Sequence, residues 1–286
     1  MKSLKQQQKR RKDILGVIGI TSILALGGGG YYFFSSNSDP LDTNNCSIKN
    51  GPEAVTAIVF DKSQMYSAEQ VTDIQTSFDL WLTGREAASK NRPIELDFFS
   101  EGTLLQLYVT DNDDVNSVGG LEPLVELCVP ADFKNANALI QNPEMMKATY
   151  QDFINQFSTI LQDLLKTQEG ITPIMETFVR ISNSKSFQSH DTKQHNMIII
   201  SDMLQHSDNY SHYAPNQGPS WKNFEQTMSG SVYLRTRLND VRWQVFLAKR
   251  DNPRDKVLQT TELTNFWEEF FYRAGATSLP WILIDG

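Results

Sequence analysis

The sequence predicts an α/β protein: a three-layer sandwich with a mainly parallel central sheet, preceded by one transmembrane helix. Two apolar runs, at residues 55–60 and 196–201, have the composition of strands that are buried on both faces. Such strands are typical of the centre of a parallel sheet. Segments with the 3.6-residue apolar period of amphipathic helices lie between the predicted strands. Strands that alternate with helices indicate a sheet covered by helices.

Length and charge set the class of protein and exclude one class of partner. The chain has 286 residues, of which 40% are hydrophobic, and can bury a full globular core. Its formal charge of −8 is unevenly distributed, because residues 1–12 carry six basic side chains and no acidic one. The rest of the chain has 20 basic and 34 acidic side chains, a net charge of −14. A body this acidic repels phosphate backbones, so we expect no nucleic-acid binding.

The amino-terminal region predicts a membrane anchor. Residues 14–34 are 21 positions without a charge, long enough as a helix to cross a hydrocarbon core of about 30 Å. The basic residues in 1–13 predict a cytoplasmic tail by the positive-inside rule. We therefore expect a single-pass protein of the inner membrane, with residues 35–286 outside the cytoplasm, in the periplasm if the source is a Gram-negative bacterium. A cleaved signal peptide is the alternative, since small residues at 25–30 resemble a cleavage region.

A polar linker connects the predicted anchor to the folded domain. Residues 35–53 are rich in Ser, Asn, Asp and Pro, and the domain is expected to occupy residues 54–286. The two cysteines of the chain, Cys46 and Cys128, both follow the anchor. In an oxidising compartment they could pair and tie the linker to the domain; two buried free thiols are the alternative that the sequence leaves open.

The first half of the domain is predicted to form a strand, a helix and two further strands. After the strand at 55–60, Ser67 and Gln70 have the spacing of a capping box that opens a helix. Two runs of alternating polarity follow at 94–99 and 103–109, and they predict a hairpin or two adjacent strands.

The second half continues the alternation of strands and helices. Pro173 is suited to the first turn of one of these helices. The remaining predicted elements are a strand at 124–129, a helix at 144–166, a helix from Pro173, strands at 196–201 and 241–248, helices at 221–228 and 261–274, and a last strand at 281–284.

Oxygen-bearing side chains collect where the predicted strands end. Asp61 and Ser63 follow the first strand, Thr172 precedes a helix, and Asp202 follows the strand at 196–201. In open α/β sheets ligands bind at the carboxyl ends of the strands, so these side chains are expected to share one site. Two carboxylates and two hydroxyls are hard oxygen donors of the kind that Mg²⁺ or Mn²⁺ prefers.

These motifs resemble those of the von Willebrand factor A-like domain. That family has a strand that ends in D-x-S-x-S, a Thr-containing turn that opens a helix, and a later apolar strand that ends in Asp. The matching segments are FDKSQM with Asp61 and Ser63, GITPI with Thr172, and IIISDM with Asp202. The resemblance covers about residues 54–284 and implies a Rossmann-like fold. It also implies a metal-ion-dependent adhesion site, in which an acidic side chain of a protein partner completes the coordination of Mg²⁺ or Mn²⁺.

The sequence departs from the family pattern at two points. Met65 stands where the second serine is normal, and a thioether is a poor ligand for a hard cation. Ser63 and Thr172 are 109 positions apart, which predicts an insertion around residues 84–140. Each candidate ligand also has an ordinary structural interpretation: Asp61 as a helix cap, Asp202 in a strand-end turn, and Thr172 as a helix N-cap.

Three functional hypotheses follow. The first is a membrane-anchored, extracytoplasmic domain that binds another protein, with Mg²⁺ at the strand ends, in an envelope or mobile-element-associated assembly. The second is a metal-dependent phosphoester hydrolase that uses Asp61 and Asp202. The third is a metal-free structural scaffold. The sequence shows no nucleophile with a base and an orienting group, which favours binding over catalysis.

Overall fold

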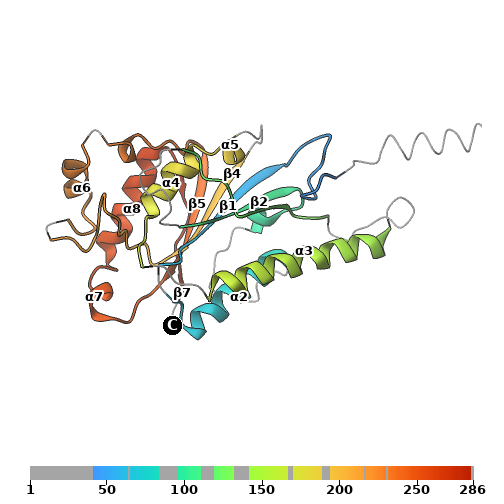
Figure 1. The fold of residues 1–286 in the computed structure, drawn as a ribbon, viewed down its shortest axis with the longest axis horizontal. Coiled ribbons are helices and arrows are strands. Elements are labelled where there is room, and N and C mark those ends of the chain that lie inside the picture. The colour runs from blue at the N-terminus through green and yellow to red at the C-terminus, as the bar shows by residue number, and fades with distance from the viewer. Residues whose placement is uncertain are drawn as a thin grey trace, which may run out of the picture.

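The computed structural model describes residues 41–63, 65–83, 96–110, 119–131, 142–166, 170–188, 194–215, 217–229 and 231–284. These residues build one seven-stranded sheet in the order β3-β2-β1-β4-β5-β6, and β7 also pairs with β5 (Figure 1). Its strands are β1 (Ala54–Phe60), β2 (Thr103–Val109), β3 (Val125–Cys128), β4 (His195–Ser201), β5 (Val241–Ala248), β6 (Thr277–Ser278) and β7 (Ile282–Ile284). Within the described ranges every strand pair is parallel except β2 with β3. The prediction of a mainly parallel sheet is confirmed.

The register of the central strands brings their carboxyl ends to one edge. Phe60 at the end of β1 pairs with Val109 of β2 and with Ile200 of β4. One step further, Ser201 of β4 pairs with Leu247 of β5. The residues that follow β1, β2, β4 and β5 therefore emerge side by side, where α/β sheets bind their ligands.

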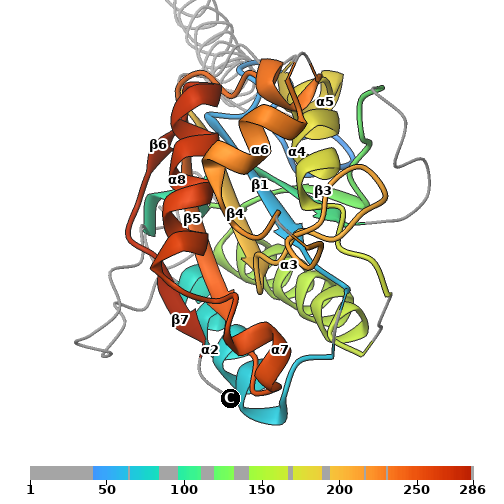
Figure 2. The same cartoon turned by 90° about the vertical axis from the view of Figure 1, so that its left-hand side faces the viewer.

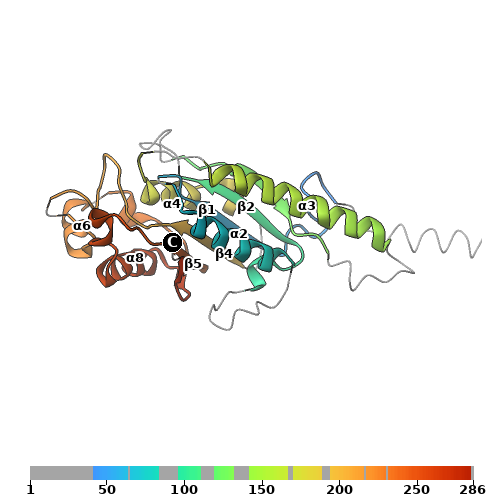
Figure 3. The same ribbon diagram turned by 90° about the horizontal axis from the view of Figure 1, so that it is seen from below.

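Helices cover both faces of the sheet. They are α2 (Ala68–Thr83), α3 (Pro143–Leu164), α4 (Ile174–Ser182), α5 (Lys185–Gln188), α6 (Trp221–Thr227), α7 (Pro253–Lys256) and α8 (Thr261–Ala274), with 3₁₀ turns at Leu96–Phe99 and Tyr233–Arg235. Figure 2 shows α4, α6 and α8 on one face, and Figure 3 shows α2 and α3 together on the other.

The alternation of side chains along β1 creates a separate core on each face. Ile58 belongs to the cluster that contains Phe78 of α2 and Phe157 of α3. Val59, the next residue, belongs to the cluster that contains Trp267 of α8. Successive strand side chains point to opposite faces, so a strand with no polar face, such as β1, needs helices on both sides.

The start of α2 has the predicted capping box. The Ser67 N–H donates to Gln70 Oε1 at 3.1 Å, and the Gln70 N–H donates to Ser67 Oγ at 3.1 Å. Gln70 Nε2 also donates to the carbonyl of Lys249 at 2.7 Å. The cap therefore fixes α2 to the carboxyl end of β5 as well as satisfying its own first turn.

One predicted strand is wrong. Leu96–Phe99 forms a 3₁₀ helix, while residues 94–95 lie outside the described part of the chain. The carbonyl of Phe98 accepts a hydrogen bond from Thr56 Oγ1 at 2.8 Å, and the Phe99 ring stacks on Trp81 with centroids 4.8 Å apart. Phe98 and Phe99 belong to the same core cluster, although successive side chains of a strand would point to opposite faces, and the 3₁₀ turn brings both into it. β2 consequently pairs in parallel with β1 and forms no hairpin with the preceding segment.

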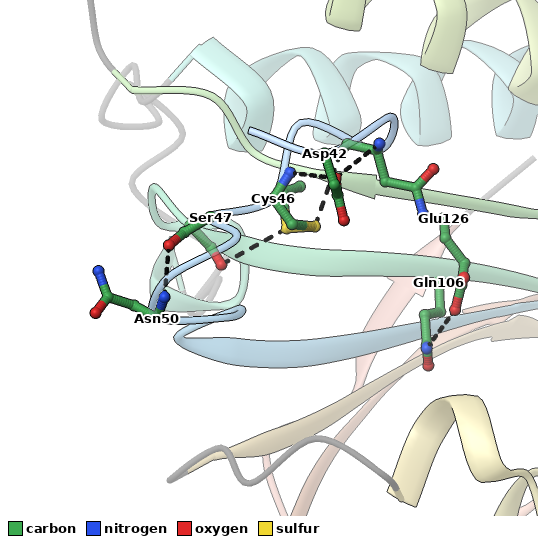
Figure 4. Close-up of a disulfide and its surroundings, with 9 residues drawn as sticks. Asp42, Cys46, Ser47, Asn50, Gln106 and Glu126 are labelled. Carbon is green, nitrogen blue, oxygen red and sulfur yellow. Dashed lines mark hydrogen bonds between the residues drawn. A yellow bond between two sulfur atoms is a disulfide. The ribbon is translucent and has the colours of Figure 1, made fainter. Parts of the chain in front are cut away.

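The segment before β1 is joined to the far edge of the sheet (Figure 4). Cys46 and Cys128 form a disulfide with their Cα atoms 5.1 Å apart. The Cys128 N–H donates to the carbonyl of Asn44 at 2.8 Å, and Asp42 Oδ1 accepts from the backbone N–H of Cys46 at 2.9 Å. The pairing that the sequence left open is confirmed. Both β2 and β3 lie within the region around 84–140 that we interpreted as an insertion, so this region contributes two strands to the sheet.

The predicted anchor lies outside the described residues, as do residues 1–13. Among the helices that the structure describes, none combines the length and the apolar character needed to span a bilayer. The anchor at residues 14–34 stays a prediction.

Candidate functional site

Two buried carboxylates meet at the carboxyl edge of the sheet. Asp61 follows β1 and Asp202 follows β4, and each is 1% exposed. Asp61 Oδ1 accepts from the Ser63 N–H at 2.9 Å and from Thr110 Oγ1 at 3.2 Å. Asp61 Oδ2 accepts from Ser201 Oγ at 2.6 Å. Neighbouring strand ends thus satisfy both oxygens of Asp61.

Asp202 is paired with an arginine from the next strand end. Its Oδ2 accepts from Arg250 Nε at 2.8 Å, and its Oδ1 accepts from the Leu204 N–H at 2.9 Å. Arg250 follows β5 and is itself buried, and its Nη1 donates to the carbonyl of Met65 at 3.2 Å. Gln259 accepts from the Arg250 N–H at 2.8 Å and donates to the Asp202 carbonyl at 3.1 Å. The ion pair is therefore held from its backbone as well as through its side chains.

The electrostatics of this pair reflect burial and mutual attraction. Burial raises the pKa of the Asp202 carboxyl to about 6, the Arg250 guanidinium opposes this rise, and Asp61 adds to it. Burial lowers the pKa of Arg250, but the combined effects of Asp202, Tyr66 and Asp61 outweigh it and leave the pKa above its ordinary value. At neutral pH the structure therefore holds a charged pair.

The other two candidate residues, Ser63 and Thr172, line an open cleft of about 670 Å³ above this edge. The buried Ser63 Oγ has no hydrogen-bond partner among the described residues. Thr172 is not the N-cap of α4, because the helix begins at Ile174 and its cap is Pro173. Thr172 instead exchanges backbone hydrogen bonds with His206 at 2.9 and 3.0 Å. This bridge places His206, from the polar segment after β4, beside Thr172 in the cleft lining.

The rest of the cleft wall comes from the segments after β4 and β5. The Tyr213 hydroxyl donates to Asp255 Oδ1 at 2.9 Å, and Asn252 Nδ2 donates to Asp255 Oδ2. The Arg254 guanidinium lies over the Tyr213 ring, 4.6 Å from its centroid. The Asp255 carboxylate is thus engaged with the wall, while Arg254 contributes a positive charge to the lining.

The four candidate ligands do not fit a divalent cation in this arrangement. Each oxygen of Asp61 and Asp202 already accepts at least one hydrogen bond, and one of them is in contact with a guanidinium. A metal ion at Asp202 would lie beside the charge of Arg250, in an environment that screens repulsion poorly. In the parts of the chain that the structure describes, no three His, Cys, Asp or Glu side chains are grouped so as to hold a metal.

Arg250 is the functional-site residue that the sequence reasoning missed. The sequence offers one signal for it, because it stands two positions after the predicted strand at 241–248. A guanidinium is not a ligand for a cation, so the pattern of oxygen donors by itself gives no indication of Arg250.

Comparison with known proteins adds no family assignment. No protein-family model matches the chain, and no curated protein is significantly similar to it. The interpretation of the site accordingly rests on its geometry, and the resemblance to the von Willebrand factor A-like domain stays a hypothesis.

A buried histidine lies behind the cleft wall. His212 packs against Phe266 with ring centroids 4.8 Å apart and against Tyr210 at 5.8 Å, and neither ring nitrogen has a partner among the described residues. Burial lowers the pKa of His212 from 6.5 to about 3. The imidazole is therefore neutral in the folded protein.

This histidine should make the protein sensitive to mild acid. In the unfolded chain His212 binds a proton near pH 6.5, whereas in the folded chain it does so near pH 3. His212 should therefore contribute a loss of about 1.4 kcal/mol per pH unit as the pH drops below 6.5, while Asp202, whose pKa burial raises to about 6, contributes in the opposite direction below that pH. The free energy of unfolding of the natural sequence, measured in urea at pH 7, 6 and 5, should decrease relative to that of His212→Phe as the pH falls. His206→Phe, which leaves His212 intact, should keep the natural slope; equal slopes for all three proteins would contradict the assignment.

Proposed function

We propose that the chain is a membrane-anchored, extracytoplasmic protein-binding domain of the von Willebrand factor A-like type. Its partner binds in the cleft at the carboxyl edge of the sheet, within an envelope or mobile-element-associated assembly. The observation that carries this proposal is the open cleft of about 670 Å³ at that edge, lined by Ser63, Thr172, His206 and Arg254.

The topology supports the Rossmann-like part of the proposal. The strand order 3-2-1-4-5-6 is that of doubly wound sheets, in which ligands bind where the order reverses beside the first strand. In this chain the reversal lies between β1 and β4, the strands that carry Asp61 and Asp202. Fold alone does not define function, so the proposal depends on the cleft at this point.

The extracytoplasmic location is supported by two independent features. Residues 14–34 have the length and composition of an anchor that follows a basic tail. The disulfide between Cys46 and Cys128 joins the segment after that anchor to β3. Disulfides persist in oxidising compartments and are rare in the cytosol.

Binding is favoured over phosphoester hydrolysis by the state of Asp61. A nucleophilic carboxylate needs an accessible oxygen, but Asp61 is 1% exposed and its oxygens accept hydrogen bonds from Ser63, Thr110 and Ser201. Asp202 is neutralised by Arg250. Neither carboxylate is presented to the cleft as a nucleophile or as a general base.

The chemistry of the cleft suits an acidic side chain of the partner. Arg254 lines both this cleft and a neighbouring hollow of about 390 Å³, so a positive charge stands where the two meet. The carboxylate beside it, Asp255, is engaged by Tyr213 and Asn252. An incoming carboxylate can therefore pair with Arg254, a role that the family resemblance assigned to a metal.

Site-specific photo-crosslinking in cells tests the proposal. Met65 lines the cleft and is 64% exposed, whereas Tyr272 on α8 is 76% exposed and does not line it. A photoreactive residue at Met65 should yield a discrete protein adduct, and the same residue at Tyr272 should not. Arg254→Glu should reduce the Met65 adduct at least severalfold, with Arg273→Glu as the charge-matched control on α8. The same adducts from both positions, or an adduct indifferent to Arg254→Glu, would contradict binding in the cleft.

A further inference from the structure

We propose that the Arg250 guanidinium supplies, from within the chain, the positive charge that a bound divalent cation would supply at the strand ends. The buried carboxylate of Asp202 then has its counter-ion without a metal. This inference concerns only the cation, so it stands or fails independently of the proposed partner.

The topology delivers Arg250 to this position. β5 lies next to β4 in parallel, with Ser201 opposite Leu247, so the residues after both strands leave the sheet together. The guanidinium then lies against Asp202, with side chains of 7% and 1% exposure. A charge buried to this degree is stable only when it is paired, and Arg250 Nε and Asp202 Oδ2 provide that pairing, while Arg250 Nη2 has no hydrogen-bond partner among the described residues.

The same side chain also shapes the loop that would carry metal ligands. Arg250 Nη1 donates to the Met65 carbonyl, and the guanidinium carbon lies 5.8 Å from the centroid of the Tyr66 ring. The Tyr66 hydroxyl donates to the carbonyls of Asp61 at 2.8 Å and Ile200 at 3.1 Å. Arg250 and Tyr66 together thus connect the loop after β1 to the ends of β4 and β5. No bridging ion is needed to set the shape of this loop.

A metal ion bound to Asp202 Oδ2 would have to displace the arginine. Coordination by Asp202 Oδ2 would break its contact with Arg250 Nε and leave a buried guanidinium without its counter-ion. The side chain of Met65, where the family pattern has a second serine, offers a hard cation no oxygen in return. Met65 and Arg250 therefore both disfavour the binding of a metal ion at this site.

Metal binding to matched variants of the full chain tests this inference. Millimolar Mg²⁺ or Mn²⁺ should leave the melting temperature of the natural protein unchanged. In Arg250→Ala the freed carboxylate of Asp202, close to that of Asp61, should bind the ion, so saturating metal should raise the melting temperature by about 5–10 °C. Adding Asp202→Asn to that variant should abolish the rise. Arg242→Ala removes a partly exposed arginine at the amino end of β5 and should show no metal response.

A second measurement keeps the test decisive if Arg250→Ala does not fold. The EPR signal of free Mn²⁺ reports binding directly, and it should be unchanged by the natural protein and by Arg250→Lys, which retains a cation. Mn²⁺ binding by the natural protein that is lost in Asp202→Asn would overturn the inference. Mn²⁺ binding by a folded Arg250→Lys protein would also overturn it. So would the absence of metal binding by a folded Arg250→Ala protein.

Discussion

Replacing Arg250 with alanine should lower the free energy of unfolding by about 3–5 kcal/mol in the absence of added metal. The substitution leaves the carboxylate of Asp202 buried at 1% exposure without its counter-ion, close to the second buried carboxylate of Asp61. It also removes the hydrogen bond to the Met65 carbonyl that holds the loop after β1. Urea unfolding at pH 7 in the presence of EDTA measures the change.

An exposed ion pair provides the control for Arg250. Arg273 on α8 pairs with Glu225 and Glu269, but these side chains are about half exposed and screened by water. Arg273→Ala should therefore change stability by no more than about 1 kcal/mol. Asp202→Asn should approach the cost of Arg250→Ala, because it leaves the guanidinium buried and unpaired. Similar small effects for all three substitutions would mean that the buried pair does not organise the strand ends.

Breaking the disulfide should cost about 2–5 kcal/mol. Cys46 and Cys128 are 82 positions apart, so the bond closes a long loop and restricts the unfolded chain strongly. The bond also holds residues 41–53 against β3, where the backbone N–H of Cys128 donates a hydrogen bond to the carbonyl of Asn44. The melting temperature of the natural protein should fall when a reductant is added.

The double variant Cys46→Ser/Cys128→Ser isolates this effect. It should melt at the temperature of the reduced natural protein and should not respond to reductant. Hydrogen exchange should become faster in residues 41–53, while β4 and β5 in the centre of the sheet stay protected. A natural protein whose melting temperature ignores reductant would show that the segment is held by packing alone.

Most of the fold was predictable because the central strands are buried on both faces. A run such as 55–60 has no polar face, and this pattern distinguishes a central parallel strand from the alternation of an edge strand. The helix start at Ser67 was equally clear, since a capping box is made by residues three positions apart. Such signals are local, and local patterns can be read from one sequence.

What could not be predicted depends on contacts between distant segments. The 3₁₀ turn at Leu96–Phe99 is held by a hydrogen bond from Thr56, 42 positions away. The bridge between Thr172 and His206, like the pair of Asp202 with Arg250, joins residues from separate elements. The sequence indicated that Asp61 and Asp202 lie at the same edge of the sheet. Placing the Arg250 guanidinium beside them requires knowledge of the register of β4 against β5.

The central claim is that an arginine of the chain itself, rather than a metal, completes the strand-end site. A crystal structure of the protein grown with Mn²⁺ and measured at the manganese absorption edge tests it most directly. The account predicts Arg250 Nε against Asp202, as in the 2.8 Å contact described above, and no anomalous peak between Asp61 and Asp202. An anomalous peak coordinated by these carboxylates, with Arg250 turned away, would contradict it.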